Sequence, residues 1–261
     1  MSGFLAHVGP LERGGPAALQ LRLAPQHLNF GGRLHGGMVM TLVCAGAEAA
    51  ARAAASAAVE MVTLDVQFMV AVQAPACVQV EVACSRRTRT LVFLRVALHS
   101  AGQCLATASA IYRVLAEAGA PPPQGDPPSL DGWNPVAWNE PFSAHVGQVY
   151  ERRRGDGLTD ALFQADATRT ACHAPVLHEG MGLFVADIFC GRAARAAAGG
   201  RCVTLAMQVR RLGAVPQDGW ATLVPQVRQG GAPVLHVDGL LCCGDRPVLA
   251  VASVWKLLGA S

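Results

Sequence analysis

The first half of this chain returns, altered, in the second half. Four short motifs recur in the same order: Phe4-x-Ala-His-Val-Gly9 as Phe142-x-Ala-His-Val-Gly147, His35-x-Gly-Met38 as His178-x-Gly-Met181, Thr63-Leu-x-x-Gln67 as Thr204-Leu-x-x-Gln208, and Tyr112-Arg-Val-Leu115 as Trp255-Lys-Leu-Leu258. Their nearly constant offset indicates a duplication. We therefore predict two copies of one folding unit, at residues 1–116 and 142–261, joined by a proline-rich linker at 117–141.

Each copy combines one long apolar helix with a series of strands. In the first copy a glycine-rich turn, Asn29–Met38, leads into an alanine-rich run from Val39 to about Ala58; in the second, His178-Glu-Gly-Met181 leads into a helix at about 180–197. Alternating apolar residues predict ten strands, at 17–24, 61–70, 76–85, 90–99, 104–115, 159–166, 203–211, 219–228, 233–242 and 247–257. This order predicts an α+β fold with antiparallel sheet.

Composition excludes several classes of protein. A net charge of +3, without a basic stripe carrying aromatic residues, argues against a nucleic-acid partner. The nine cysteines form no C-x-x-C pair, so neither a zinc site nor a disulfide framework is indicated, and we expect no metal. The N-terminus lacks a signal-peptide pattern, and we expect no apolar run of the ~20 residues that a membrane helix needs. A cytoplasmic protein without a membrane partner is therefore expected.

A long helix after a glycine-rich turn, with antiparallel strands around it, resembles the hotdog fold. The string Asn29-x5-His35-Gly36-Gly37 resembles the H-G-G branch of hotdog acyl-CoA thioesterases. The resemblance implies a double hotdog, in which each central helix is wrapped by a five-stranded sheet and the two units form an intrachain pseudo-dimer. It also implies an acyl-CoA substrate, no metal or redox cofactor, and sites built across the interface between units.

In that family the site implies an Asn or Gln six residues before the His, a Gly amide, an acid nine residues after the His, and a Ser or Thr on the next strand. The first copy has Asn29, His35, Gly36 and Thr63, but Cys44 replaces the acid. The second copy has Asp187 and Thr204, but Cys172 and Glu179 replace the Asn and the first Gly. Neither copy is complete.

Helix geometry indicates how the two copies complement each other. Nine helical residues advance roughly 13 Å, so Asp187 cannot act at the start of its own helix. We therefore predict one composite site that joins Asn29, His35 and Gly36 of the first copy to Asp187 and Thr204 of the second. The reciprocal site, with Cys44 in place of the acid, is predicted to be degenerate.

The predicted roles follow from the chemistry of each group. Asp187, in an apolar helix, would serve as general base or nucleophile, and the Gly36 N–H would stabilise an oxyanion. Asn29 and Thr204 would position the reactants, while His35 and Gly37 would shape the loop and bind substrate. The alternatives are a buried, hydrogen-bonded Asp187 and a simple tight turn at Gly36. Cys44 is interpreted as a packed thiol rather than a nucleophile.

A run of arginines, Arg86, Arg87 and Arg89, lies where the family often receives the phosphates of coenzyme A; exposed turn charges explain it nearly as well. G-x-S-x-G, G-x-x-x-x-G-K and G-x-G-x-x-G motifs are absent from the sequence. The predicted function is hydrolysis of acyl-CoA or related pantetheine thioesters. The alternatives are a non-catalytic acyl-thioester binding or assembly module and a hotdog enoyl-thioester hydratase or dehydratase. Pairing of two pseudo-dimers into a homodimer is also possible.

Overall fold

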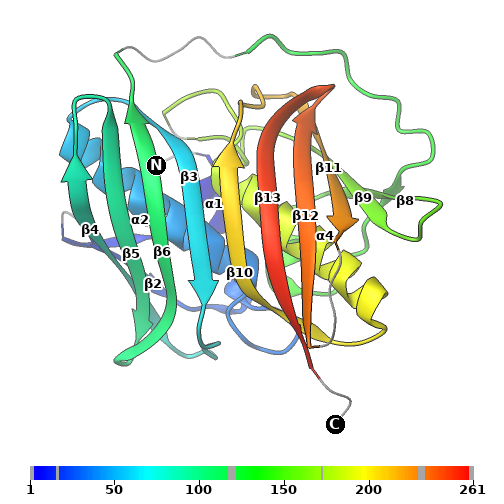
Figure 1. The fold of residues 1–261 in the computed structure, drawn as a ribbon, viewed down its shortest axis with the longest axis horizontal. Helices are drawn as coiled ribbons and strands as arrows, with labels where there is room; N and C mark the ends of the chain where they lie inside the picture. The colour runs from blue at the N-terminus through cyan, green and yellow to red at the C-terminus, as the bar shows by residue number, and fades with distance from the viewer. Residues whose placement is uncertain (1–2, 16–17, 117–121, 172, 229–232, 259–261) are drawn as a thin grey trace.

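The computed structural model describes residues 3–15, 18–116, 122–171, 173–228 and 233–258. Two long helices, α2 (Gly36–Ala55) and α4 (Glu179–Ala198), lie side by side against one face of a single 13-stranded sheet (Figure 1). The strands of the first unit are β1 (Glu12–Gly15), β2 (Ala18–Arg22), β3 (Val59–Phe68), β4 (Cys77–Arg87), β5 (Leu91–Ser100) and β6 (Gln103–Val114). Those of the second unit are β8 (Tyr150–Arg153), β9 (Thr159–Gln164), β10 (Cys202–Arg211), β11 (Trp220–Val227), β12 (Val234–Cys243) and β13 (Arg246–Leu257).

The order of strands shows the duplication directly. It runs β1-β2-β4-β5-β6-β3 through the first unit and continues β10-β13-β12-β11-β9-β8 through the second, with every pairing antiparallel. All ten predicted strands are present. Three more were not predicted: β1, β8 and β7 (Asn134–Pro135), a two-residue strand at the end of the sheet. The double-hotdog prediction is confirmed.

The two units join through β3 and β10, which form one continuous sheet. The pairing runs from Gln67 opposite Ala206 to Thr63 opposite Arg210. α2 packs mainly on β4 and β5, and α4 on β11 and β12, so the helices meet behind the β3–β10 junction. The start of each helix is thereby brought to the middle of the other, which places residues of both units at one position.

The strand pairing corrects one of the sequence matches. Tyr112 in β6 pairs with Met61 in β3, and its duplicate Trp255 in β13 pairs with Thr204 in β10; an extra residue follows at the same place in both pairs. Thr204 therefore corresponds in space to Met61, not to Thr63. The Thr-Leu-x-x-Gln match is two residues out of register, so the first unit has no threonine in the position of Thr204.

α2 is a core helix that is covered by protein on almost every face. It is 20 residues long, its mean hydropathy is 1.3 over an 18-residue window, and 72% of that window is buried. Within the described ranges α2 alone has the length and composition of a membrane-spanning helix. The expectation that no apolar run approaches that length was therefore wrong for α2, although its burial is that of a core helix.

Two short helices cross between the units. α1 (Phe4–Val8) belongs to the first unit, but the Phe4 N–H donates to Thr170 O at 2.9 Å. Its duplicate α3 (Pro141–Val146) belongs to the second unit, but the Phe142 N–H donates to Leu28 O at 3.2 Å. Each short helix therefore covers the other unit. A 3₁₀ turn, η1 (Pro25–His27), lies beside α3.

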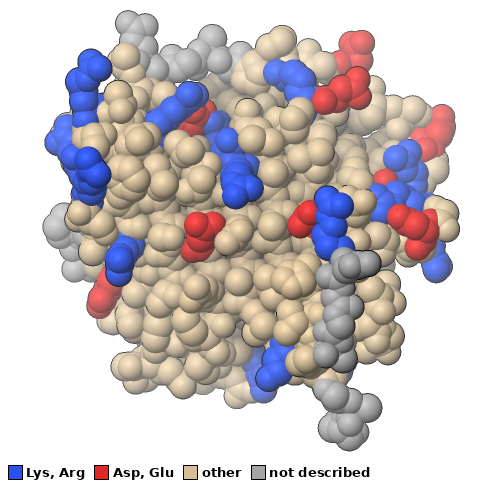
Figure 2. Space-filling view, viewed as in Figure 1, with Lys and Arg blue, Asp and Glu red and all other residues tan. Residues whose placement is uncertain are grey.

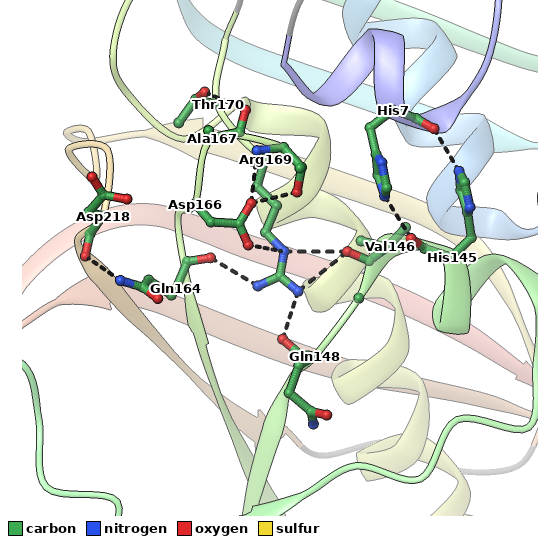
Figure 3. Close-up of polar contacts among 12 residues, drawn as sticks. His7, His145, Val146, Gln148, Gln164, Asp166, Ala167, Arg169, Thr170 and Asp218 are labelled. Carbon is green, nitrogen blue, oxygen red and sulfur yellow. Dashed lines mark hydrogen bonds and ion pairs between the residues drawn. The ribbon is translucent and has the colours of Figure 1, made fainter.

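The crossing helices meet at a pair of stacked histidines (Figure 3). The ring centroids of His7 and His145 are 4.5 Å apart, and the Nε2 of each lies 2.7 or 2.6 Å from the carbonyl oxygen of the other. Beside them Arg169 is buried and donates to Gln148 O at 2.7 Å and to Gln164 O at 2.9 Å. These bonds hold the start of the second unit against the turn that precedes α4.

The connecting segment lies along the second unit. Between residues 122 and 133 the chain forms no helix or strand, in agreement with its proline content. Trp133 lies under the Arg152 guanidinium, 4.4 Å from its carbon to the ring centroid, and Trp138 donates to Gly147 O at 2.9 Å. The two tryptophans thus attach the far end of the segment to the second unit.

Candidate active site

The site begins at the first turn of α2, which His35 caps. His35 is the N-cap residue in extended conformation, and its Nδ1 accepts the Gly37 N–H at 2.9 Å. The N–H of Gly36 has no hydrogen-bond partner among the described residues. An unpaired N–H at a helix N-terminus is a donor for an anion or a carbonyl oxygen that becomes one.

Asp187 of α4 lies directly against that donor. A β-carbon built on Gly36 would lie 2.6 Å from Asp187 Oδ2, and His35 Nδ1 is 3.9 Å from the same oxygen. The other carboxylate oxygen, Oδ1, accepts the Thr204 hydroxyl at 3.0 Å. The structure therefore brings together four of the predicted groups, from α2, α4 and β10, at the boundary of the two units.

The electrostatics of Asp187 follow from its surroundings. Its side chain is only 8% exposed, and burial raises the pKa of Asp187 above the usual range of aspartate. The charge of His35 and the hydrogen bond from Thr204 act in the opposite direction. A raised pKa makes the carboxylate a stronger base when it is ionised.

Three aromatic side chains form the wall beside His35. Phe142 of α3 lies 5.1 Å from His35 and 5.2 Å from Phe184, measured between ring centroids, and Trp138 lies 6.2 Å from Phe184. Phe184 also closes the side of Gly37, where an added β-carbon would lie 2.8 Å from its ring. The wall is built by the second unit and the connecting segment, and it packs against His35 and Gly37 of the first unit.

Sequence reasoning missed one charged residue at this site. Glu140, the N-cap residue of α3, accepts from His35 Nε2 at 3.0 Å and from the Ser143 hydroxyl at 3.1 Å. Burial acts to raise the pKa of Glu140, but His35 and Ser143 together lower it below the usual range. Glu140 follows a proline-rich stretch without periodicity, and the only signal for it was its place two residues before the repeated Phe142.

Two other predicted residues, Asn29 and Gly37, form hydrogen bonds within the loop and the first turn of α2. Asn29 Oδ1 accepts the N–H groups of Gly31 at 2.9 Å and Arg33 at 3.2 Å, and no described hydrogen bond links it to Asp187. Asn29 thus holds the turn that leads into α2. The Gly37 N–H is taken by His35, so this donor is already paired, and substrate binding by Gly37 stays a prediction.

The three arginines lie at the opposite end of α2. Arg87 donates to Ala55 O at 3.2 Å, at the C-terminal end of the helix that Gly36 begins. Twenty helical residues span about 30 Å, so Arg86, Arg87 and Arg89 do not reach the Gly36 cleft. All three are exposed, and Figure 2 shows Lys and Arg gathered over the end of β4. We therefore exclude them from the candidate site.

The reciprocal cleft, at the start of α4, is filled by ion pairs. Glu179 stands where the first unit has Gly36, and Arg211 Nε lies 3.1 Å from its Oε1; Arg211 also pairs with Glu60. Burial, with the nearby charge of Glu48, raises the pKa of Glu179 to about 7. Cys172, predicted to replace the Asn here, lies outside the described residues.

The remaining group in this cleft is a thiol. Cys44 is 1% exposed, and burial raises its pKa well above the usual range, as expected of a packed thiol. His178 caps α4 as His35 caps α2, with Nδ1 accepting the Gly180 N–H at 3.0 Å. Within the described ranges no group of three or more His, Cys, Asp or Glu side chains could hold a metal ion.

These features define a double-hotdog protein in which groups of both units meet at Gly36 and Asp187. The sequence matches no protein-family model and no curated protein. Solved structures are similar over nearly the whole chain. A TesB protein of Mycobacterium avium subspecies paratuberculosis has a TM-score of 0.73 at 16% identity and covers 98% of each chain. The acyl-CoA thioesterase II TesB2 of Mycobacterium marinum has a TM-score of 0.68 at 16% identity and covers 98% of each chain.

A hot dog fold protein of unknown function from Alicyclobacillus acidocaldarius is also similar in structure over nearly the whole chain. Its TM-score is 0.72 at 14% identity, and the match covers 97% of each chain. At these identities the likeness establishes the fold, and the activity has to be argued from the cleft.

Proposed function

We propose that this protein hydrolyses acyl thioesters of coenzyme A, or of a related pantetheine carrier, at the cleft between Gly36 and Asp187. The observation that carries the proposal is the position of Asp187 Oδ2, 2.6 Å from where a β-carbon of Gly36 would lie. A base and an oxyanion donor, contributed by different units, thereby face the same small volume. The name of the Mycobacterium marinum structure, an acyl-CoA thioesterase II, supports the choice of substrate class.

The proposed reaction uses three groups of the chain. The thioester carbonyl oxygen accepts the Gly36 N–H, which the absence of a side chain leaves accessible. Asp187 removes a proton from water as the water oxygen bonds to the carbonyl carbon, and Thr204 orients the carboxylate through its hydrogen bond. When the carbon–sulfur bond breaks, the proton on Asp187 passes to the departing thiolate. The products are a carboxylic acid and a free thiol, without a metal or redox cofactor.

Direct attack by Asp187 on the carbonyl carbon is the variant of this mechanism that the same geometry serves. It would form an acyl–Asp187 anhydride and release the thiolate, and water would then cleave the anhydride. Hydrolysis in ¹⁸O water under single-turnover conditions tests for this route. Label in Asp187 shows that water cleaved an anhydride at the Asp187 carbonyl, whereas label only in the released acid shows attack of water at the acyl carbon, which the general-base route requires.

A non-catalytic acyl-thioester binding module is the second candidate function. The observation in its favour is the burial of Asp187, whose side chain is 8% exposed and leaves little room for water. A hydratase or dehydratase has less support, because His35 Nδ1 already accepts the Gly37 N–H and His35 is thus engaged as a helix cap.

Release of free thiol from short, long and aromatic acyl-CoAs tests the proposal. Wild type and Asp187→Ala are compared on the same panel. Turnover by wild type that falls at least a thousandfold in the variant supports hydrolysis at this cleft. Binding of acyl-CoA without turnover in either protein supports the binding module, and equal turnover in both contradicts the assigned site.

We place the reaction in the cytoplasm, where acyl-CoAs are abundant and the scattered cysteines stay reduced.

A further inference from the structure

We propose that Glu140 is a positioning residue of the composite site, acting through His35 to hold the first turn of α2 against Asp187. The inference rests on the proposed function for its meaning, but its geometry is independent of the substrate. Glu140 lies 105 residues from His35 in the sequence and reaches it from the segment that connects the two units.

The hydrogen bonds around His35 fix its tautomer. Nδ1 accepts the Gly37 N–H at 2.9 Å, so this nitrogen carries a lone pair rather than a proton. The proton of the neutral ring therefore lies on Nε2, which donates to Glu140 Oε2 at 3.0 Å. Replacing that acceptor with an apolar group would remove one of the two contacts that favour Nε2–H and leave the other, from the Gly37 N–H. The opposite tautomer would direct an N–H at the Gly37 N–H and break the cap.

The cap affects the position of Gly36, because Gly36 lies between the two residues that this hydrogen bond joins, His35 and Gly37. His35 precedes Gly36 and bonds to the residue after it, so a rotated ring displaces the N–H that faces the cleft. Asp187 Oδ2 is 3.9 Å from His35 Nδ1 and shares this space. A displacement of about 1 Å between reacting groups can cost about 100-fold in rate. Glu140 thus acts on the reaction without contacting it.

The position of Glu140 is itself well fixed. Ser143, one turn into α3, donates to the same carboxylate oxygen at 3.1 Å, and the side chains of Glu140 and His35 are 18% and 6% exposed. Phe142 packs against His35 with its ring tilted, and its N–H donates to Leu28 O. The carboxylate is therefore held from α3, which in turn is held on the first unit.

The duplicated cleft offers an internal comparison. His178 makes the same cap, but its Nε2 is buried without a hydrogen-bond partner among the described residues. Counted back from the repeated phenylalanine, the residue equivalent to Glu140 is Ser2, which lies outside the described residues. The carboxylate thus occurs at the cleft that has an acid, Asp187, and is replaced in sequence at the cleft that has lost one.

Imidazole nitrogen chemical shifts, with thioesterase kinetics, test the proposal. Wild type, Glu140→Gln and Glu140→Ala are compared, with His35→Asn to assign the His35 signals. We expect a neutral Nε2–H ring in wild type and in Glu140→Gln, whose amide oxygen still accepts, with kcat within about threefold. In Glu140→Ala we expect a mixed or reversed tautomer and a kcat lower by about 10- to 100-fold, with KM little changed.

Glu151→Ala is the matched control, because it removes another partly buried glutamate of the second unit, paired with Arg192 of α4 rather than with His35. We expect it to leave both the His35 signals and kcat unchanged. The proposal is overturned if His35 in Glu140→Ala keeps the wild-type tautomer, or if kcat is unaffected although the tautomer changes. If wild type hydrolyses no thioester while the tautomer responds as expected, the proposed function fails and the positioning contact stands.

Discussion

Gly36 and Asp187 touch across the boundary between the two repeats, so closely that a β-carbon on Gly36 would lie 2.6 Å from Asp187 Oδ2. A distance under 3 Å between such atoms requires one of them to move. Because α4 is packed on both sides, the side chain of Asp187 has to rotate away from the helix start. The glycine is thus needed for the approach of the acid, in addition to any need of the substrate.

We therefore expect Gly36→Ala to lose at least 100-fold in kcat/KM, while its unfolding free energy changes by about 1–2 kcal/mol. Steady-state kinetics with the best acyl-CoA and urea denaturation measure the two effects. Gly200→Ala is the control, since a β-carbon there would contact nothing within 4 Å. A Gly36→Ala variant with wild-type turnover would show that the Gly36–Asp187 contact is not part of the reaction.

Replacing Asp187 with Asn should stabilise the protein while abolishing turnover. Burial raises the pKa of Asp187, so the folded state binds this proton more tightly than the unfolded state does. Stability is therefore lost as the pH rises through the interval from the unfolded to the folded pKa. At neutral pH the neutral amide should gain about 1 kcal/mol. Thermal unfolding of both proteins at several pH values checks this, and the gain should shrink towards acid pH.

The acid limb of the activity profile should report on Thr204. Its hydroxyl donates to Asp187 and lowers the pKa of that carboxyl, so Thr204→Val should move the acid limb of kcat/KM to higher pH. Thr63→Val is the control: Thr63 shares the sequence motif but pairs with exposed Arg210 on the outer face of the sheet. A pH profile shifted equally by both substitutions would contradict the assigned contact.

At the reciprocal cleft, removing Arg211 should cost stability rather than activity. The side chains of Arg211 and Glu179 are only 11% and 17% exposed, so Arg211→Met leaves a buried carboxylate unpaired. We expect a loss of about 3–5 kcal/mol at pH 8. The loss should be smaller at pH 6, because Glu179, with a pKa of about 7, is then largely protonated.

Arg228→Met provides the comparison for that measurement. Arg228 pairs with Asp238 at 2.7 Å, but the two side chains are 54% and 39% exposed. Such a pair contributes less than about 1 kcal/mol. Urea denaturation at both pH values distinguishes the two variants, and equal losses would show that the Arg211 pair is not sealed from water.

The main features of the fold follow from sequence because they rest on periodicity. Alternation identified every long strand, and the apolar runs identified α2 and α4 within a few residues. The short strands β1 and β8 escaped, since Glu12-Arg-Gly-Gly15 and Tyr150-Glu-Arg-Arg153 have no apolar alternation. They form only because neighbouring strands offer unpaired edges.

Some parts of the candidate site could likewise be predicted from the sequence, and others could not. The helix rise showed that Asp187 cannot act at the start of its own helix, and the resemblance to the hotdog family, whose sites span two units, implied that it meets Gly36 of the other unit. The register of Thr63 was misjudged because the Thr-Leu-x-x-Gln match drew attention away from Met61, which has the same spacing to Tyr112 as Thr204 has to Trp255. Glu140 could not be found either, because its contact with His35 depends on how α3 crosses to the first unit. The position of the three arginines along α2 did not follow from the family pattern, and their binding of coenzyme A phosphates stays a prediction.

The ion pairs of Glu179 show what a covalent fusion permits. In a dimer of identical chains, any substitution appears in both clefts, so a change that fills one cleft also destroys the other. Here each position is encoded once. One cleft therefore has Cys44 in place of the acid and Glu179, paired with Arg211, in place of the glycine, while the other cleft keeps both. The chain should accordingly bind one equivalent of a tight transition-state analogue, and titration to a stoichiometry of two would mean that the filled cleft still opens.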